Sequence, residues 1–216
     1  MSIHKTYAVF GLGRYGQAVA KELHESGAEV IGVDIHETTV NEAAAYLPVC
    51  KCADVTDVAV LRQLGIDEVD AVIVAMASSL ESSVLTVALC KEIGVPLVVV
   101  KCGNETHRKI LQRVGADRVV FPENESGVRL AKNLLSSGFV DVIELSRDVS
   151  MIEMDVRPEW VGKTLIELGL RKKYSLNVAA IREHGEVSID IDPQRPLEAG
   201  MKLIVIADGN KINKLL

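Results

Sequence analysis

The stretch Tyr7–Gly16, with the sequence YAVFGLGRYG, decides the fold of this chain. A short apolar run typical of a buried strand leads into G-x-G-x-x-G, and an amphipathic helical pattern follows at once. Glycines at these positions allow a tight turn, let the backbone approach a pyrophosphate and let the helix pack on the strand. The positive N-terminus of the helix would then face the phosphates. The motif therefore predicts a nucleotide site.

The same rhythm of a short apolar run and a helical period continues to about residue 136. Strands that alternate with helices form a parallel sheet covered on both faces. This predicts an α/β fold, a Rossmann-like doubly wound sheet, with a ligand crevice at the carboxyl ends of the strands. The expected strands are Tyr7–Phe10, Glu29–Asp34, Val49–Cys52, Ala71–Ala75, Leu97–Val100 and Arg118–Phe121, and the expected helices are Tyr15–Ser26, Thr38–Ala45, Asp57–Leu64, Ser79–Ile93, Glu105–Val114 and Glu125–Leu135.

A different pattern follows, so we expect a nucleotide-binding domain over 1–136, a crossover or linker over 137–146, and a small C-terminal α+β domain over 147–216. The run Phe139–Leu145 is too apolar for a free linker and indicates a segment that crosses to a partner or a neighbouring domain. The last domain should contain a hairpin around His184 and Gly185 and a charged terminal helix. Its expected elements are the strands Met151–Val156, Asn177–Arg182, Glu186–Ile191 and Lys202–Ala207 and the helix Lys163–Leu170.

Composition excludes several classes of protein. The chain has 216 residues, 48% of them hydrophobic, and a net charge of −6, which argues against general binding to nucleic acid. No apolar run approaches the ~20 residues that span a bilayer, and the first strand begins almost at once, so we expect a cytoplasmic chain without a signal peptide. The cysteines fit no zinc spacing, and we expect them to be reduced residues in or near the core: Cys50, Cys52, Cys90 and Cys102.

Polar residues follow several of the expected strands. Asp34 lies eighteen residues after Gly16, where an acid accepts hydrogen bonds from ribose hydroxyls and repels a 2′-phosphate; the alternative is a cap of the next helix. Asp54 could accept a bond from an adenine amino group or cap the helix near Asp57, and the sequence leaves both open. Small residues after the fourth strand would let a ligand lie across it. The neighbours included in this site are Ile35, Val55, Ala75 and Met76.

Arg14 distinguishes this loop from a plain dinucleotide fingerprint, because a guanidinium beside the phosphates offers charge-assisted contacts to a terminal phosphate. Lys101 ends the fifth strand and Glu123 follows the sixth, both at the ligand edge of the sheet. A carboxylate there could hold Mg²⁺ or Ca²⁺ beside phosphates, and the alternative is a Lys–Glu surface pair.

The expected second domain contains no clear acid–base constellation, which favours a binding module over an enzyme. The serines near residue 80 lack the G-x-S-x-G pattern and are expected to cap a helix. One alternative is a small NAD-dependent oxidoreductase. Another is an NADH redox sensor that acts on transcription, but no segment before Tyr7 or after Ala207 is long enough for a basic helix-turn-helix.

Taken together, several motifs resemble the RCK (TrkA-type) regulatory subunits of bacterial potassium uptake systems, and the Ktr type in particular. The resemblance implies octameric rings that dock on the cytoplasmic face of a membrane potassium channel subunit, with ATP favouring the conducting ring, ADP the closed one, and NAD(H) bound in some members. It places Gly11, Gly13, Arg14, Tyr15 and Gly16 around the phosphates, with Arg14 on the γ-phosphate and Glu123 near a divalent cation. The motifs are Gly11–Gly16, Val33–Asp34, Ala53–Thr56, Val100–Lys101 and Gly115–Glu123.

The second domain resembles the C-terminal domain of the family, which in Ktr members binds cyclic di-AMP at a dimer interface and inactivates uptake. By this resemblance Arg171 would pair with phosphate, and Asn177 with Val178 would contact adenine. Gly169 stands where the family has an acid. The alternative is a helix-end arginine and a strand-start asparagine. The residues that match the family pattern are Leu165, Ile166, Arg171, Asn177 and Val178.

Overall fold

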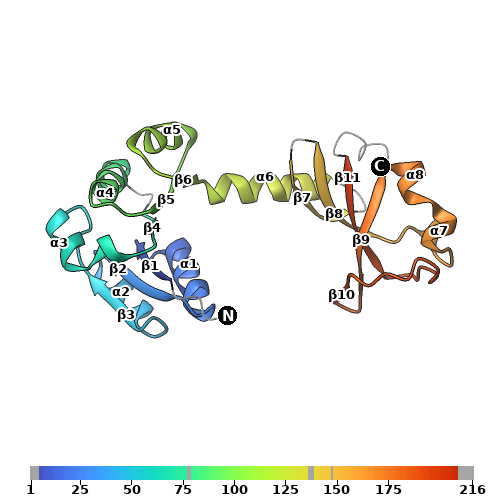
Figure 1. The fold of residues 1–216 in the computed structure, drawn as a ribbon, viewed down its shortest axis with the longest axis horizontal. Helices are drawn as coiled ribbons and strands as arrows, with labels where there is room; N and C mark the ends of the chain where they lie inside the picture. The colour runs from blue at the N-terminus through green and yellow to red at the C-terminus, as the bar shows by residue number, and fades with distance from the viewer. Residues whose placement is uncertain (1–4, 77–78, 136–138, 147, 209–216) are drawn as a thin grey trace. The chain divides into compact units, whose positions relative to one another are not determined.

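The computed structural model describes residues 5–76, 79–135, 139–146 and 148–208, and the chain divides into two compact units between Glu123 and Asn124 (Figure 1). Among these residues, no helix combines the length and the apolar character that crossing a membrane requires.

The first unit is built on a six-stranded parallel sheet with the order β3-β2-β1-β4-β5-β6. This order is Rossmann-like, in agreement with the expected doubly wound sheet, and the direction of winding reverses between β1 and β4. A short 3₁₀ helix, η1 (Ile66–Glu68), precedes β4. The strands are β1 (Thr6–Phe10), β2 (Glu29–Asp34), β3 (Val49–Cys52), β4 (Ala71–Val74), β5 (Leu97–Lys101) and β6 (Arg118–Val120), and the helices are α1 (Arg14–Glu25), α2 (Glu37–Ala43), α3 (Val58–Gln63), α4 (Leu80–Glu92), α5 (Glu105–Val114) and α6 (Pro122–Leu135).

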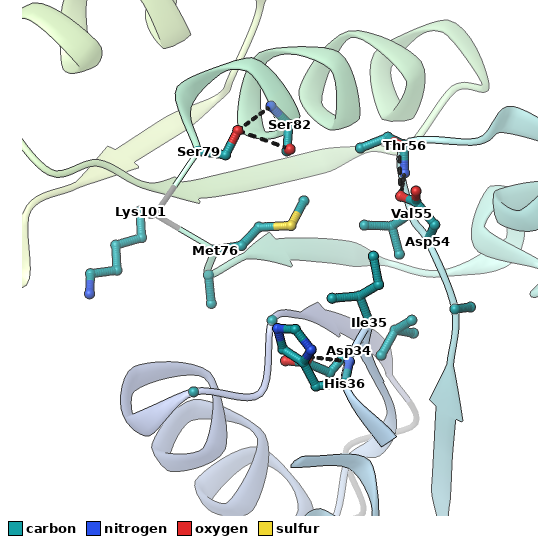
Figure 2. A pocket seen from close by; sticks show the side chains of 15 residues that line it. Asp34, Ile35, His36, Asp54, Val55, Thr56, Met76, Ser79, Ser82 and Lys101 are labelled. Atoms are coloured by element: carbon teal, nitrogen blue, oxygen red, sulfur yellow. Dashed lines mark hydrogen bonds between the residues drawn. The ribbon is translucent and has the colours of Figure 1, made fainter. Parts of the chain in front are cut away.

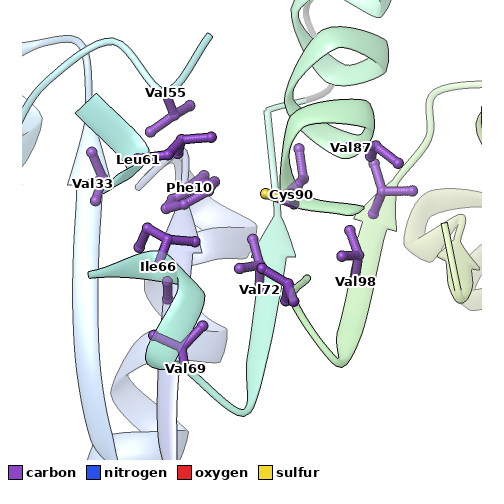
Figure 3. Close-up of a cluster of buried hydrophobic side chains, with 14 of the residues drawn as sticks. Phe10, Val33, Val55, Leu61, Ile66, Val69, Val72, Val87, Cys90 and Val98 are labelled. Carbon is purple, nitrogen blue, oxygen red and sulfur yellow. The ribbon is translucent and has the colours of Figure 1, made fainter. Parts of the chain in front are cut away.

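Both faces of this sheet carry a hydrophobic core. In β1, Phe10 packs in one cluster with Leu61 and Ile66 (Figure 3), while its neighbour Val9 packs in the other with Leu47. Successive side chains of a strand point to opposite faces, so a run that is apolar at every position needs cover on both sides. This is why β1, β4 and β5 read as continuous apolar runs.

A carboxylate joins α4, β5 and the turn after α5. Gly115 ends α5 in the left-handed region, with φ of 111°, as the sequence predicts for a helix stop. Asp117 follows, and its carboxylate accepts hydrogen bonds from the Val98 N–H at 2.7 Å and from Lys91 Nζ at 2.9 Å. The Val98 contact, with Lys91 adding to it, lowers the pKa of Asp117.

The second unit contains an antiparallel five-stranded sheet with the order β10-β9-β11-β8-β7. Its core includes Trp160, Leu176 and Leu203. The expected hairpin forms around His184 and Gly185, but its second strand ends at Ser188 because only three of its residues pair with β9. The elements are β7 (Phe139–Glu144), β8 (Val149–Asp155), η2 (Pro158–Trp160), α7 (Leu165–Leu168), α8 (Leu170–Tyr174), β9 (Leu176–Glu183), β10 (Glu186–Ser188) and β11 (Lys202–Asp208).

Two expectations about this unit need correction. The described part of the expected crossover at 137–146 contains a strand of the sheet, because Phe139–Glu144 pairs with β8. The expected helix Lys163–Leu170 is instead two short helices, since Gly169 adopts a left-handed conformation with φ of 57° between them. The expected terminal helix lies outside the described residues.

Candidate functional site

A crevice of about 450 Å³ opens at the carboxyl ends of the first five strands of the parallel sheet (Figure 2). Ligands bind at this edge of doubly wound sheets, where the strand order reverses. Nine residues predicted for the nucleotide site line it: Gly11, Gly13, Asp34, Ile35, Asp54, Val55, Ala75, Met76 and Lys101. The other lining residues were not predicted for the site: Val33, His36, Ala53, Thr56, Ser79 and Ser82. Arg14, Tyr15, Gly16 and Glu123 are not among the lining residues.

The glycine loop is tight at two positions and open at the third. Gly11 has φ of 87°, and a Cβ built on it would lie 3.0 Å from the Met76 nitrogen. A Cβ on Gly16 would overlap the carbonyl oxygen of Gly11. A Cβ on Gly13, the residue before α1, would meet no atom within 4 Å. The loop thus keeps open space beside the start of α1, where first-turn N–H groups attract anions.

Asp34 joins the glycine loop to the turn before α2. Its Oδ2 accepts a hydrogen bond from the Leu12 N–H at 2.7 Å, and its Oδ1 accepts one from the His36 N–H at 2.9 Å. His36, not Asp34, is the N-cap residue of α2. An ionised carboxylate has about four acceptor positions, so these two bonds leave capacity for ribose hydroxyls.

Asp54 lies across the crevice from Lys101 (Figure 2). Its carboxylate accepts bonds from the Thr56 hydroxyl at 2.6 Å and the Thr56 N–H at 2.9 Å. These bonds lower the pKa of Asp54. Of the two roles left open by the sequence, the helix cap belongs to another residue, because Asp57 accepts the Ala59 N–H at 2.8 Å at the start of α3. Contact with adenine stays a prediction for Asp54.

Serines at the start of α4 hold the segment that follows β4. Ser79 is the N-cap and accepts the Ser82 N–H at 3.1 Å, which confirms the expected capping role. The buried Ser83 hydroxyl donates to the Met76 carbonyl at 2.6 Å. Met76 in turn closes against Gly11, so this serine fixes one wall of the crevice.

Basic and acidic groups meet at the end of the crevice near β5. Lys101 Nζ lies 2.6 Å from Glu123 Oε1, and the exposed fractions of the two side chains are 15% and 62%. The same ammonium lies 5.5 Å from the centre of the Tyr15 ring, a cation–π arrangement. The bond from Lys101 lowers the pKa of Glu123, and the charge of Arg14 adds to this effect.

Within the described residues, Glu123 alone does not make a site for a divalent cation. Glu123 is a single carboxylate that already accepts a bond from Lys101. Throughout the residues that the structure describes, no group of three or more His, Cys, Asp and Glu side chains is arranged to hold a metal. Hard cations prefer several oxygen ligands, so a cation at Glu123 would depend on oxygens from elsewhere.

A hollow of about 470 Å³ lies in the second unit, where α7 and α8 meet the start of β9. Ile166 is 61% exposed at its edge. All five residues predicted for the second ligand line this hollow, although they come from three elements. The lining residues are Leu165, Ile166, Gly169, Leu170, Arg171, Lys172, Leu176, Asn177 and Val178.

Comparison with known proteins places both units in described families. Residues 7–122 match the TrkA-N domain, and residues 149–216 match the TrkA-C domain. The chain is 38% identical over 210 residues to Ktr system potassium uptake protein C of Bacillus subtilis, covering 97% of this chain and 95% of that protein. It is 35% identical over 212 residues to Ktr system potassium uptake protein A of Vibrio alginolyticus, covering 98% and 96%.

Solved structures share the fold. The GsuK channel has a TM-score of 0.72 at 16% identity and covers 98% of this chain, which spans only 39% of that longer chain. A GsuK channel bound to NAD has a TM-score of 0.67 at 16% identity, with 97% and 38% covered. Both domain matches and the near full-length identity agree, so the chain belongs to the TrkA-type (RCK) family, together with the Ktr system potassium uptake proteins A and C.

Proposed function

We propose that this chain is a regulatory subunit that senses an adenine nucleotide and controls potassium uptake through a membrane channel subunit. ATP favours the conducting state and ADP the closed state. NAD(H) is the competing occupant of the crevice, since one solved channel of the same fold is bound to NAD. In this proposal the chain acts as a regulator and not as an enzyme, and two of its relatives are named as potassium uptake proteins.

The crevice supports this function most directly. Its glycine loop is open at Gly13, and Asp34 stands at the end of β2 with both oxygens oriented by backbone N–H groups. In this proposal the first turn of α1 holds the phosphates and Asp34 accepts the ribose hydroxyls. The exposed side chain of Ile35 and the buried Val55 offer apolar contact to the base. A 2′-phosphate would be repelled by Asp34, which disfavours NADP.

Arg14 distinguishes ATP from ADP in this proposal. It is exposed at the first residue of α1 and outside the residues that line the crevice, and its charge helps to lower the pKa of Glu123. From there it can reach a third phosphate, bound in its own crevice or in that of a second copy of the chain. A ligand shifts a conformational equilibrium only by its difference in affinity for the two states, and a contact made by one nucleotide alone supplies such a difference.

Calorimetric titration of the full chain with ATP, ADP and NAD tests this assignment. Arg14→Ala should leave ADP binding unchanged and weaken ATP binding roughly tenfold, which is the scale of one exposed charge-assisted contact. Arg113→Ala, at another exposed arginine in the last turn of α5, should change neither affinity. An Arg14→Ala protein that still prefers ATP as the wild type does would contradict the role of Arg14.

The hollow in the second unit is proposed to take cyclic di-AMP, which would inactivate uptake. Arg171 supplies the cation for a phosphate, and Asn177 with Val178 provides a hydrogen-bonding and apolar edge for adenine. Arg171→Ala should abolish binding of cyclic di-AMP in calorimetry while ADP binding persists. Binding that survives this change would leave Arg171 with only its helix-end role.

The proposed assembly is an octameric ring on the cytoplasmic side of the membrane, bound to a potassium channel subunit. Glu123 would contribute to a cation site there only together with oxygens from other groups. Light scattering should give the mass of eight chains when ATP or ADP is present, and membranes that contain the channel subunit should retain the ring. A monomer that purifies with NADP would overturn the proposal.

A further inference from the structure

We infer that Lys101 exchanges Glu123 for the anionic end of the bound ligand, and that this exchange transmits occupancy of the crevice to the start of α6. The inference rests on the proposed nucleotide function and assigns a positioning role within that site. It differs from a cation-holding role for Glu123, because it needs no metal.

Lys101 lies at the end of the crevice with its side chain mostly shielded from solvent. It is the last residue of β5, it lines the crevice, and its side chain is 15% exposed. A lysine buried this far needs a partner for its ammonium group, because desolvation without one is costly. In the structure that partner is Glu123, at 2.6 Å, with the Tyr15 ring 5.5 Å away.

The ammonium of Lys101 also lies close to the place where a ligand anion would bind. Tyr15, whose ring it faces, is the second residue of α1. The ammonium is therefore beside the start of α1, which the open space at Gly13 leaves accessible. An anionic group bound there would attract the same ammonium. The ligand's anionic group and Glu123 would then compete for the ammonium of Lys101, while the charge of Arg14 continues to act on Glu123.

Glu123 keeps stabilising contacts after the exchange. It is the second residue of α6, and a backbone N–H of its own residue already helps to lower its pKa. A carboxylate in the first turn of a helix is stabilised by the N–H groups and the dipole there. With a side chain 62% exposed, it can also be solvated. The exchange therefore leaves no buried charge behind, and it changes the charge contacts of the first turn of α6.

Calorimetry in EDTA, with adenosine and ADP as probes on the full chain, tests the exchange without metal. Glu123→Gln removes the competing charge, so ADP should bind about fivefold more tightly while adenosine binding stays unchanged. Lys101→Met, which keeps an apolar stem, should weaken ADP roughly tenfold and adenosine little. In the double variant the gain from Glu123→Gln should disappear. Lys91→Met removes a comparable ion-paired lysine outside the crevice and should leave both affinities unchanged.

The inference is overturned if Glu123→Gln leaves ADP binding in EDTA unchanged or weaker, or if its gain persists in the Lys101→Met background. If Lys101→Met fails to fold, Lys101→Gln serves instead and should weaken ADP binding in the same way. The response at α6 is measured in the wild type by amide hydrogen exchange, which should change in the first turn of α6 with ADP but not with adenosine. A wild type that binds adenosine and ADP but shows no such change contradicts the inference alone, whereas one that binds neither contradicts the proposed function as well.

Discussion

Changing Gly13 to alanine should weaken ligand binding while leaving the stability of the fold nearly unchanged. A Cβ at this position would meet no atom of the chain within 4 Å, and φ of −68° suits alanine. The stability should therefore fall only by the difference between glycine and alanine before a helix, about 0.5 kcal/mol. The methyl group would, however, occupy the space beside the first turn of α1. Losing one charge-assisted contact to a phosphate corresponds to at least a tenfold weaker affinity for ADP, from about 1.5–3 kcal/mol.

Gly16→Ala provides the contrast. Its Cβ would overlap the Gly11 carbonyl oxygen and lie 3.3 Å from Ala75 Cβ, so the backbone must move. The strain of such overpacking lowers the free energy of unfolding by about 1–3 kcal/mol. The higher helix propensity of alanine offsets up to about 1 kcal/mol of this loss. We expect a net loss of about 1–2 kcal/mol, a melting temperature lower by roughly 2–8 °C, and weaker ADP binding.

The assay must follow the first unit. The chain has one tryptophan, and Trp160 lies in the second unit, so its fluorescence does not report on the glycine loop. Amide hydrogen exchange of β1 gives the local stability, and calorimetry gives the ADP affinity. Gly127→Ala is the matched control, since it lies in α6 with no atom within 4 Å of its Cβ and should leave ADP binding unchanged. Gly13→Ala binding ADP as tightly as wild type, or Gly16→Ala as stable as wild type, would refute the reasoning.

Three further changes test the fold. The ionised Asp117 should stabilise the protein above about pH 4. Because its folded pKa is lowered, this contribution should vanish as the pH falls through that pKa. Asp117→Asn should therefore flatten the acid limb of a curve of stability against pH. Leu203→Ala, in the fully buried centre of the second sheet, should cost about 2–5 kcal/mol and shift the denaturation midpoint followed by Trp160 fluorescence. Asp57→Ala should remove the cap of α3 and cost about 1 kcal/mol, measured by chemical denaturation of the first unit with circular dichroism. An unchanged midpoint for either of the last two would contradict the packing or capping described.

The parallel sheet was predictable because its signals are local. Each strand is a short apolar run, and helix stops such as Gly115 mark the boundaries between elements. The carboxyl ends of the strands must then meet at one edge, so the residues after them, such as Asp34 and Lys101, could be assigned to one crevice. His36 was missed because it reaches that edge through a turn whose course depends on the hydrogen bond to Asp34.

The second unit was less predictable because its pairing is not local. Phe139–Glu144 has the apolar character of a strand, but only its register with β8 shows which sheet it joins. The break at Gly169 depends on a left-handed backbone conformation that a glycine permits but does not require. The five residues of the second hollow come from three elements, and their grouping in sequence analysis came from the resemblance and not from any periodic pattern.

The two backbone bonds of Asp34 have a kinetic consequence. Because the Leu12 and His36 N–H groups already orient this carboxylate, its conformational entropy is lost during folding and not at the moment of ligand capture. Association should then proceed without a slow ordering step, and different nucleotides should arrive at similar rates. The protein would then distinguish nucleotides by how long each stays bound, so their affinities should differ mainly through the dissociation rate constant.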